Sequence, residues 1–95
     1  MEKKQLLYKL GEVIRKRGEK TKKRHGNFWS LTLQSNIIFT HDDYNHSVHA
    51  QYPDGSDFYF GMDFGGFTGD HVSEQHFLST IELIETEPLK KAAQS

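Results

Sequence analysis

The sequence contains no cysteine, only two prolines and no long run of apolar residues. The absence of cysteine excludes disulfide scaffolds, cysteine-ligated zinc and thiol nucleophiles, and it is typical of the cytoplasm, where we expect the protein to act. Because no 18 apolar residues run together and the basic opening stretch lacks the apolar centre of a signal peptide, we expect neither membrane insertion nor export. A chain of 95 residues predicts one domain, residues 1–95, with a small core.

Positive charge is scarce in the second part of the chain and negative charge is scarce in the first. The first 24 residues hold ten Lys and Arg against three Glu, a net charge of +7. From His25 onward, two Lys oppose ten Asp and Glu, a net charge of −8. A basic segment favours polyanions and an acidic surface favours basic partners, so the whole-chain charge of −1 conceals two different preferences.

The spacing of apolar residues predicts a helix from Lys3 to Arg17. Leu6, Leu10 and Ile14 recur at helical intervals, and Gly18 stands where a helix typically stops. The following residues, 19–26, are charged or polar apart from one glycine. We interpret them as a charged connection.

Apolar and polar residues alternate from Asn27 to Phe64, which is typical of antiparallel strands with one buried face. Three turns are expected between four strands: Gln34-Ser35-Asn36, Asp42 to Asn45, and Pro53-Asp54-Gly55. The pairs that these turns predict are Leu31 with Phe39, Phe39 with Val48, His41 with His46, and Val48 with Phe60. Because a slip of one residue would turn every side chain to the other face, the agreement of three turns supports a meander. The last strand is expected to point Phe58, Phe60, Met62 and Phe64 into the core.

A second helix is predicted to begin near Ser73 and to end at or before Glu87. Val72 and Phe77 flank this start as a hydrophobic staple, and Pro88 cannot continue a helix. The apolar stripe of the helix is expected to be Phe77, Leu78, Ile81 and Ile84. We expect residues 89–95 to form a frayed tail. The order α-β-β-β-β-α predicts an α+β fold, in which a four-stranded antiparallel meander carries the N- and C-terminal helices on one face.

The face of the sheet without helices is expected to be polar and acidic. We interpret it as a docking surface for a protein partner with a basic surface, where charge aids encounter and aromatic side chains supply contact area. The residues assigned to this site are Asp54, Asp57, Tyr59, Asp63, Phe67 and Asp70. No catalytic set, cofactor motif or family motif is evident. We therefore expect a small non-enzymatic protein-binding module, of inhibitor, immunity, antitoxin-like or adaptor type, with no cofactor.

Two alternative functions stay open. The basic segment, whose cations include Lys16, Arg17, Lys20, Lys22, Lys23 and Arg24, could bind nucleic acid, although a solvated helix end with favourable dipole contacts is the simpler interpretation. A metal-dependent hydrolase could use His41, Asp43 and His46, although hydrogen-bonded histidines at the end of the apolar face are the simpler interpretation. Available sheet edges also leave a homodimer open.

Overall fold

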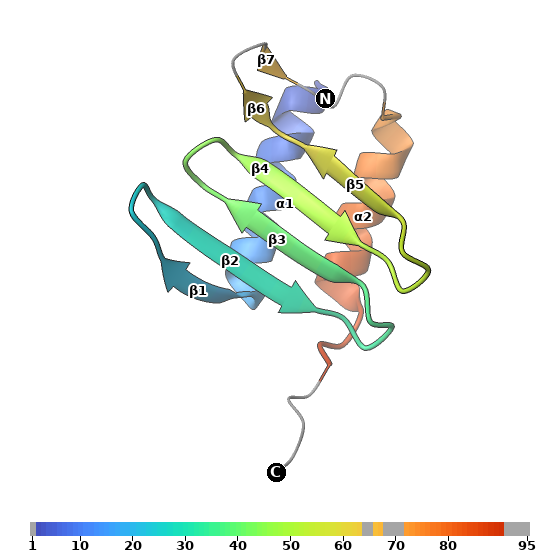
Figure 1. Ribbon diagram of the computed structural model, residues 1–95. Coiled ribbons are helices and arrows are strands. Elements are labelled where there is room, and N and C mark those ends of the chain that lie inside the picture. The colour runs from blue at the N-terminus through green and yellow to red at the C-terminus, as the bar shows by residue number, and fades with distance from the viewer. Residues whose placement is uncertain (1, 64–65, 68–71, 91–95) are drawn as a thin grey trace.

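The computed structural model describes residues 2–63, 66–67 and 72–90, with residues 62–63 and 66–67 described by their backbone alone. The elements are α1 (Lys3–Arg17), β1 (Glu19–Lys22), β2 (Asn27–Thr32), β3 (Ile38–Asp42), β4 (Ser47–Gln51), β5 (Asp57–Phe60), β6 (Met62–Asp63), β7 (Gly66–Phe67) and α2 (Glu74–Thr86). Strands β1 to β5 form one antiparallel sheet in sequence order, and β6 pairs with β7. Both helices cover the same face of the five-stranded sheet (Figure 1). The predicted α+β class and meander are thus confirmed.

The two helices have the predicted boundaries. The first spans Lys3–Arg17, and the second is capped by Ser73, whose Oγ accepts a hydrogen bond from the His76 amide at 3.1 Å. The stripe of α2 differs from the prediction at Leu78, which is 44% exposed, and at Thr80, which is buried instead. The Thr80 hydroxyl donates to the His76 carbonyl at 2.8 Å, so its burial leaves no unpaired hydroxyl.

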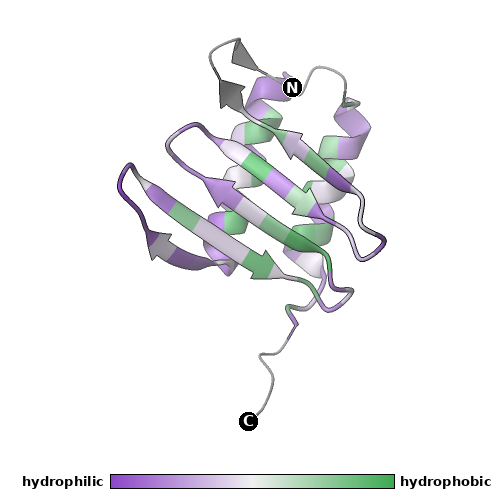
Figure 2. Ribbon diagram, in the orientation of Figure 1, coloured by the Kyte–Doolittle hydropathy of each residue, from purple (hydrophilic) through white to green (hydrophobic). Residues whose placement is uncertain are grey.

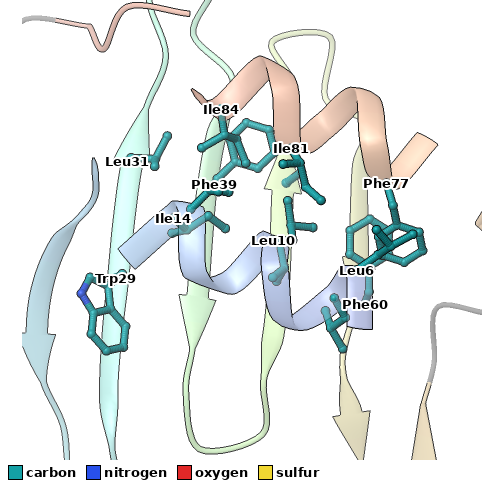
Figure 3. Close-up of a cluster of buried hydrophobic side chains, with 14 of the residues drawn as sticks. Leu6, Leu10, Ile14, Trp29, Leu31, Phe39, Phe60, Phe77, Ile81 and Ile84 are labelled. Carbon is teal, nitrogen blue, oxygen red and sulfur yellow. The ribbon is translucent and has the colours of Figure 1, made fainter. Parts of the chain in front are cut away.

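The core lies between the helix pair and the sheet, where side chains from α1, α2 and the central strands interdigitate (Figure 3). Each fully buried aliphatic or aromatic side chain contributes about 1.5 to 3 kcal/mol relative to exposure. The buried hydrophobic residues are Leu6, Leu7, Leu10, Val13, Ile14, Trp29, Leu31, Leu33, Phe39, Val48, Ala50, Phe60, Val72, Phe77, Ile81 and Ile84.

Two of the three predicted turns have the predicted register. Leu31 pairs with Phe39, and Val48 pairs with Phe60. The expected left-handed residues are also present, with φ of 71° at Asn36. At the other confirmed turn, between β4 and β5, φ is 92° at the glycine.

The register of the β3–β4 hairpin differs from the prediction. The expected pairing of His41 with His46 is wrong, because His41 pairs with Val48 and Phe39 pairs with Ala50. The loop is one residue later than expected and ends at His46, whose φ is 55°. Since the resulting shift is two residues, every side chain keeps its predicted face.

A fifth strand, β1, occupies part of the segment 19–26, for which the charge pattern predicts a connection. Lys20 pairs with Trp29 and Thr21 with Phe28, which adds β1 to the edge of β2. All four residues of β1 are exposed, so backbone hydrogen bonds and not side-chain burial hold it in place. Lysines on an edge strand also disfavour pairing with a further chain.

The other end of the meander is shorter than predicted. Strand β5 ends at Phe60, and the chain turns so that β6 pairs with β7. Phe60 is buried as expected, whereas Phe58 is 37% exposed and packs its ring at 4.8 Å from that of His76 on α2. The predicted core positions of Met62 and Phe64 lie outside the side chains that the structure describes.

The segment after α2 returns to the sheet. Leu89 forms an isolated bridge with Leu33, and the Lys90 amide donates to the Thr32 carbonyl at 2.8 Å. The first two residues of the expected frayed tail are therefore paired with the chain near β2. Residues 91–95 lie outside the described part of the chain.

Candidate functional site

The candidate binding surface is the face of the sheet opposite the helices, here called the open face. It consists of the strand residues that alternate with the core positions in the observed register, and hydropathy alternates in the same way along β4 and β5 (Figure 2). The strand positions of the open face include three carboxylates and no Lys or Arg. Its members are Glu19, Thr21, Phe28, Ser30, Thr32, Ile38, Thr40, Asp42, Ser47, His49, Gln51, Asp57 and Tyr59.

The part of the open face nearest β5 combines aromatic area with negative charge. Tyr59 is 47% exposed, and its ring lies edge-on to that of His49, with centroids 6.5 Å apart. The Nε2 atom of His49 lies 2.8 Å from Oδ2 of Asp57. This contact orients both side chains without covering them. Ile38, at 36% exposure, adds apolar area on β3.

The predicted protein-binding residues are only partly brought together. Asp57 and Tyr59 lie on the open face, and Asp54 lies in the adjoining turn. Two hydrogen bonds from Ser56 to the Asp54 carboxylate lower the pKa of Asp54, so this turn stays anionic. Asp63 and Phe67 belong to the β6–β7 pair, for which only the backbone is described, and Asp70 lies outside the described residues.

The predicted basic segment divides into cations with intramolecular partners and cations on the surface. Arg17 donates from Nη1 to the carbonyls of Ile84 and Glu87, and Lys23 forms an ion pair with Asp42. The Nζ atom of Lys16 lies 3.9 Å from Oε1 of Glu12. The remaining predicted cations are exposed and form no ion pair within the part of the chain that the structure describes; they are Lys20, Lys22 and Arg24.

His41, the centre of the alternative metal site, has hydrogen bonds at both ring nitrogens. Its Nδ1–H donates to the Ser47 carbonyl at 2.9 Å, because a carbonyl oxygen can only accept. Nε2 must then accept, and Arg15 Nη1 donates to it at 2.9 Å. Burial, the largest effect, lowers the pKa of His41, and the Arg15 charge lowers it further against the Ser47 bond. His41 is therefore a neutral structural side chain in this arrangement.

The other two members of that alternative site also have structural contacts. The Asp43 carboxylate accepts a hydrogen bond from the backbone N–H of Asn27 at 2.7 Å, and this bond lowers the pKa of Asp43. The His46 ring packs edge-on against Tyr8, with centroids 4.8 Å apart. Among the residues described, no group of three or more His, Cys, Asp or Glu side chains has the arrangement of a metal site.

Two arginine contacts were not predictable from local pattern. Arg15 lies over the Trp29 ring, 5.9 Å from its centroid, while it donates to His41. Arg17 joins the end of α1 to the end of α2. The only sequence signal for either role is that Arg17 falls on the apolar stripe of its helix, where a solvated cation is not expected.

Comparison of the chain with protein-family models, curated proteins and solved structures found no match. Neither helix in the described part of the chain has the length and apolar character needed to cross a lipid bilayer.

Proposed function

We propose that the protein is a small non-enzymatic protein-binding module that uses its open face to bind a basic surface of a protein partner. The observation that carries this proposal is the combination, on the sheet face that the described helices leave open, of three carboxylates, exposed Tyr59 and exposed Ile38, with no Lys or Arg among the strand positions of that face. One of the carboxylates, Asp42, is paired with Lys23. Apolar contact area within an acidic surround fits the general anatomy of a transient protein interface. Negative charge would guide the approach of a basic partner.

The open face is also firmly supported from behind. Ala50, Val48 and Phe39, on the opposite side of the same strands, are almost completely buried. A strand whose alternate residues are locked in a core holds its outward side chains in fixed positions. Such preorganisation reduces the entropy that binding must overcome.

The test is affinity capture from a lysate of the source cells, with bound proteins identified by mass spectrometry. The open-face variant is Asp57→Asn/Tyr59→Ala, and the matched control, Tyr8→Ala/Glu82→Gln, removes a tyrosine and a carboxylate from the helices. We expect a protein that the wild type and the control recover and the open-face variant does not. Its recovery should fall as salt rises from about 50 mM to 500 mM, because screening weakens charge attraction.

Equal recovery by the two variants, or no recovered protein at low salt, would contradict the proposal. The thermal melting curves of both variants must resemble that of the wild type, which separates loss of binding from loss of fold.

A second candidate, nucleic-acid binding, is favoured by one observation: Lys20, Lys22 and Arg24 are exposed around the β1–β2 hairpin without an ion pair among the described residues. Nuclease treatment of one arm of the same capture distinguishes it. Under this candidate, nucleic acid is recovered with the untreated protein and lost on Lys20→Ala/Lys22→Ala/Arg24→Ala, because phosphate contacts dominate such binding.

A further inference from the structure

A groove runs between the two helices on the side of the molecule away from the sheet. It measures about 560 Å³, and its apolar part comprises Leu6, Tyr8, Leu78 and Ile81. Leu78 is 44% exposed and Tyr8 is 42% exposed, so apolar area reaches the surface beside the groove. Nothing in the described part of the chain lies over this groove.

Charge is sorted between the two helices that form the groove. Helix α1 has six Lys and Arg and one Glu, a net charge of +5, whereas α2 has three Glu and no Lys or Arg, a net charge of −3. On the groove side, Lys9 and Lys16 flank Glu12 at 3.9 Å each. Glu82 and Glu85 are exposed on α2 and form no ion pair within the described residues. Glu82 and Glu85 follow the groove-lining residues Leu78 and Ile81 by four positions, so they share that face of α2 and give it two negative charges. On the facing side of α1, Lys9, Glu12 and Lys16 sum to a net charge of +1. The two sides of the groove therefore differ in the sign of their charge.

This sorting decides between possible occupants. A uniformly basic partner would be attracted by α2 and repelled by α1. An anionic membrane surface would be attracted by α1 and repelled by α2. A surface that is itself divided into a basic and an acidic half complements both sides at once. A second copy of this chain has such a surface.

We propose that the protein self-associates through the outer faces of α1 and α2, with each α1 over the α2 of the partner copy. The two helices run in the same direction, since Arg17 at the end of α1 binds carbonyls at the end of α2 (Figure 1). A twofold axis along the groove places unlike helices together, whereas an axis across the groove would place α1 on α1 and α2 on α2. Charge thus selects the first arrangement.

The interface is small. A helix of 13 residues is about 20 Å long, and two neighbouring helices present a face about 20 Å wide. Such a face lies at the small end of specific interfaces, so the dimer is weak and concentration-dependent. Its affinity falls with salt, because opposite charges at a partly exposed interface are screened.

The decisive experiment uses two charge reversals, Lys9→Glu and Glu82→Lys, measured by sedimentation equilibrium at low salt. Each variant alone places like charges opposite each other twice across the twofold axis, and its self-association is expected to weaken by about tenfold or more. An equimolar mixture of the two restores association, because each helix pair then joins opposite charges. In the alternative arrangement, with α1 over α1, each substitution alone would only replace one like-charge contact by another. The weakening in the separate variants therefore distinguishes the two arrangements, and the recovery in the mixture shows that the weakening is caused by charge.

The apolar contribution is tested with Leu78→Lys, which should abolish self-association. The matched control is Ile38→Lys, which makes the same kind of substitution at an exposed aliphatic residue of the open face. This control should leave self-association unchanged. Far-ultraviolet circular dichroism confirms that each variant is folded. A monomeric wild type at all concentrations and salts, or a mixture no more associated than the separate variants, would overturn the proposal. Loss on Ile38→Lys and not on Leu78→Lys would place any dimer on the open face instead.

This inference does not depend on the proposed partner-binding function, since the two surfaces lie on opposite sides of the molecule. Failure of the dimer leaves the open-face capture unaffected, and the reverse also holds.

Discussion

At the scale of single residues, Gly11 sets how closely α1 approaches the sheet. A Cβ atom at this position would lie 2.6 Å from Cε1 of His41, closer than packed atoms approach. The imidazole cannot easily move away, because Arg15 and the Ser47 carbonyl hold both of its nitrogens. A glycine in mid-helix is therefore required by packing.

We predict that Gly11→Ala lowers the free energy of unfolding by about 1 to 3 kcal/mol through overpacking. The intrinsic helix preference of alanine, about 1 kcal/mol better than glycine, opposes this effect and is expected to be outweighed. Urea denaturation followed by Trp29 fluorescence measures the change. In a His41→Ala background, the same substitution should cost less, because the clashing ring is gone. An equal cost in both backgrounds would show that His41 is not the cause.

The neutral state of His41 makes stability depend on pH. Burial lowers the pKa of His41 in the folded protein below its ordinary value of 6.5, so the unfolded chain takes up the proton more readily. The stabilising contribution is then fully present above pH 6.5 and is lost as the pH falls from 6.5 towards the lowered pKa.

We therefore predict that the free energy of unfolding of the wild type falls more between about pH 7.5 and pH 5 than that of His41→Gln. The variant will be less stable at pH 7.5, and the difference should narrow on acidification. His25→Gln, at an exposed histidine, is the matched control and should follow the wild type. A constant difference between wild type and His41→Gln across this range would contradict the assignment of a lowered pKa.

At the scale of elements, Arg17 connects the ends of both helices. If the hydrogen bonding of α2 continued, the Ile84 carbonyl would accept from the backbone N–H of residue 88. That residue is Pro88, which has no N–H. Arg17 Nη1 supplies the missing donor and also bonds the Glu87 carbonyl at 2.7 Å. The proline that ends α2 thus creates the acceptor that the last residue of α1 satisfies.

We predict that Arg17→Met lowers the free energy of unfolding by about 1 to 3 kcal/mol, since it keeps the apolar stem and removes the charged donor. Lys16→Met is the control one residue away, at a side chain with 66% exposure, and should change stability by no more than about 0.5 kcal/mol. Chemical denaturation of both variants provides the comparison. Similar losses for the two would mean that the bonds to the end of α2 contribute little.

The elements also differ in how well sequence could predict them. Both helices and two of the three hairpins were predictable, because apolar spacing and residues such as Asn36 and Gly55 directly express the local geometry. The β3–β4 register was not, since its left-handed residue is His46, a type with no strong turn preference. Strand β1 has no buried side chain, and its pairing with β2 therefore leaves no hydrophobic period in the sequence.

At the scale of the whole molecule, the candidate surfaces were harder to predict than the fold. Sequence pattern predicted that Asp57 and Tyr59 share the uncovered face, because strand alternation determines faces. It could not predict that Arg17 and Lys23 are used within the molecule, since their acceptors on α2 and β3 are distant in sequence. Overall charge asymmetry was visible, but its division between two adjacent parallel helices depends on tertiary packing.

The parallel packing of α1 on α2 has a consequence for synthesis. These helices come from opposite ends of the described chain, yet Leu6, Leu10 and Ile14 share one core with Phe77 and Ile84. A chain emerging from the ribosome cannot complete this core until the last helix is available, and contacts so distant in sequence form slowly. Until α2 has been synthesised, α1 can bury its apolar stripe only against strands β2 to β4, so the part of the stripe that packs on α2 stays exposed.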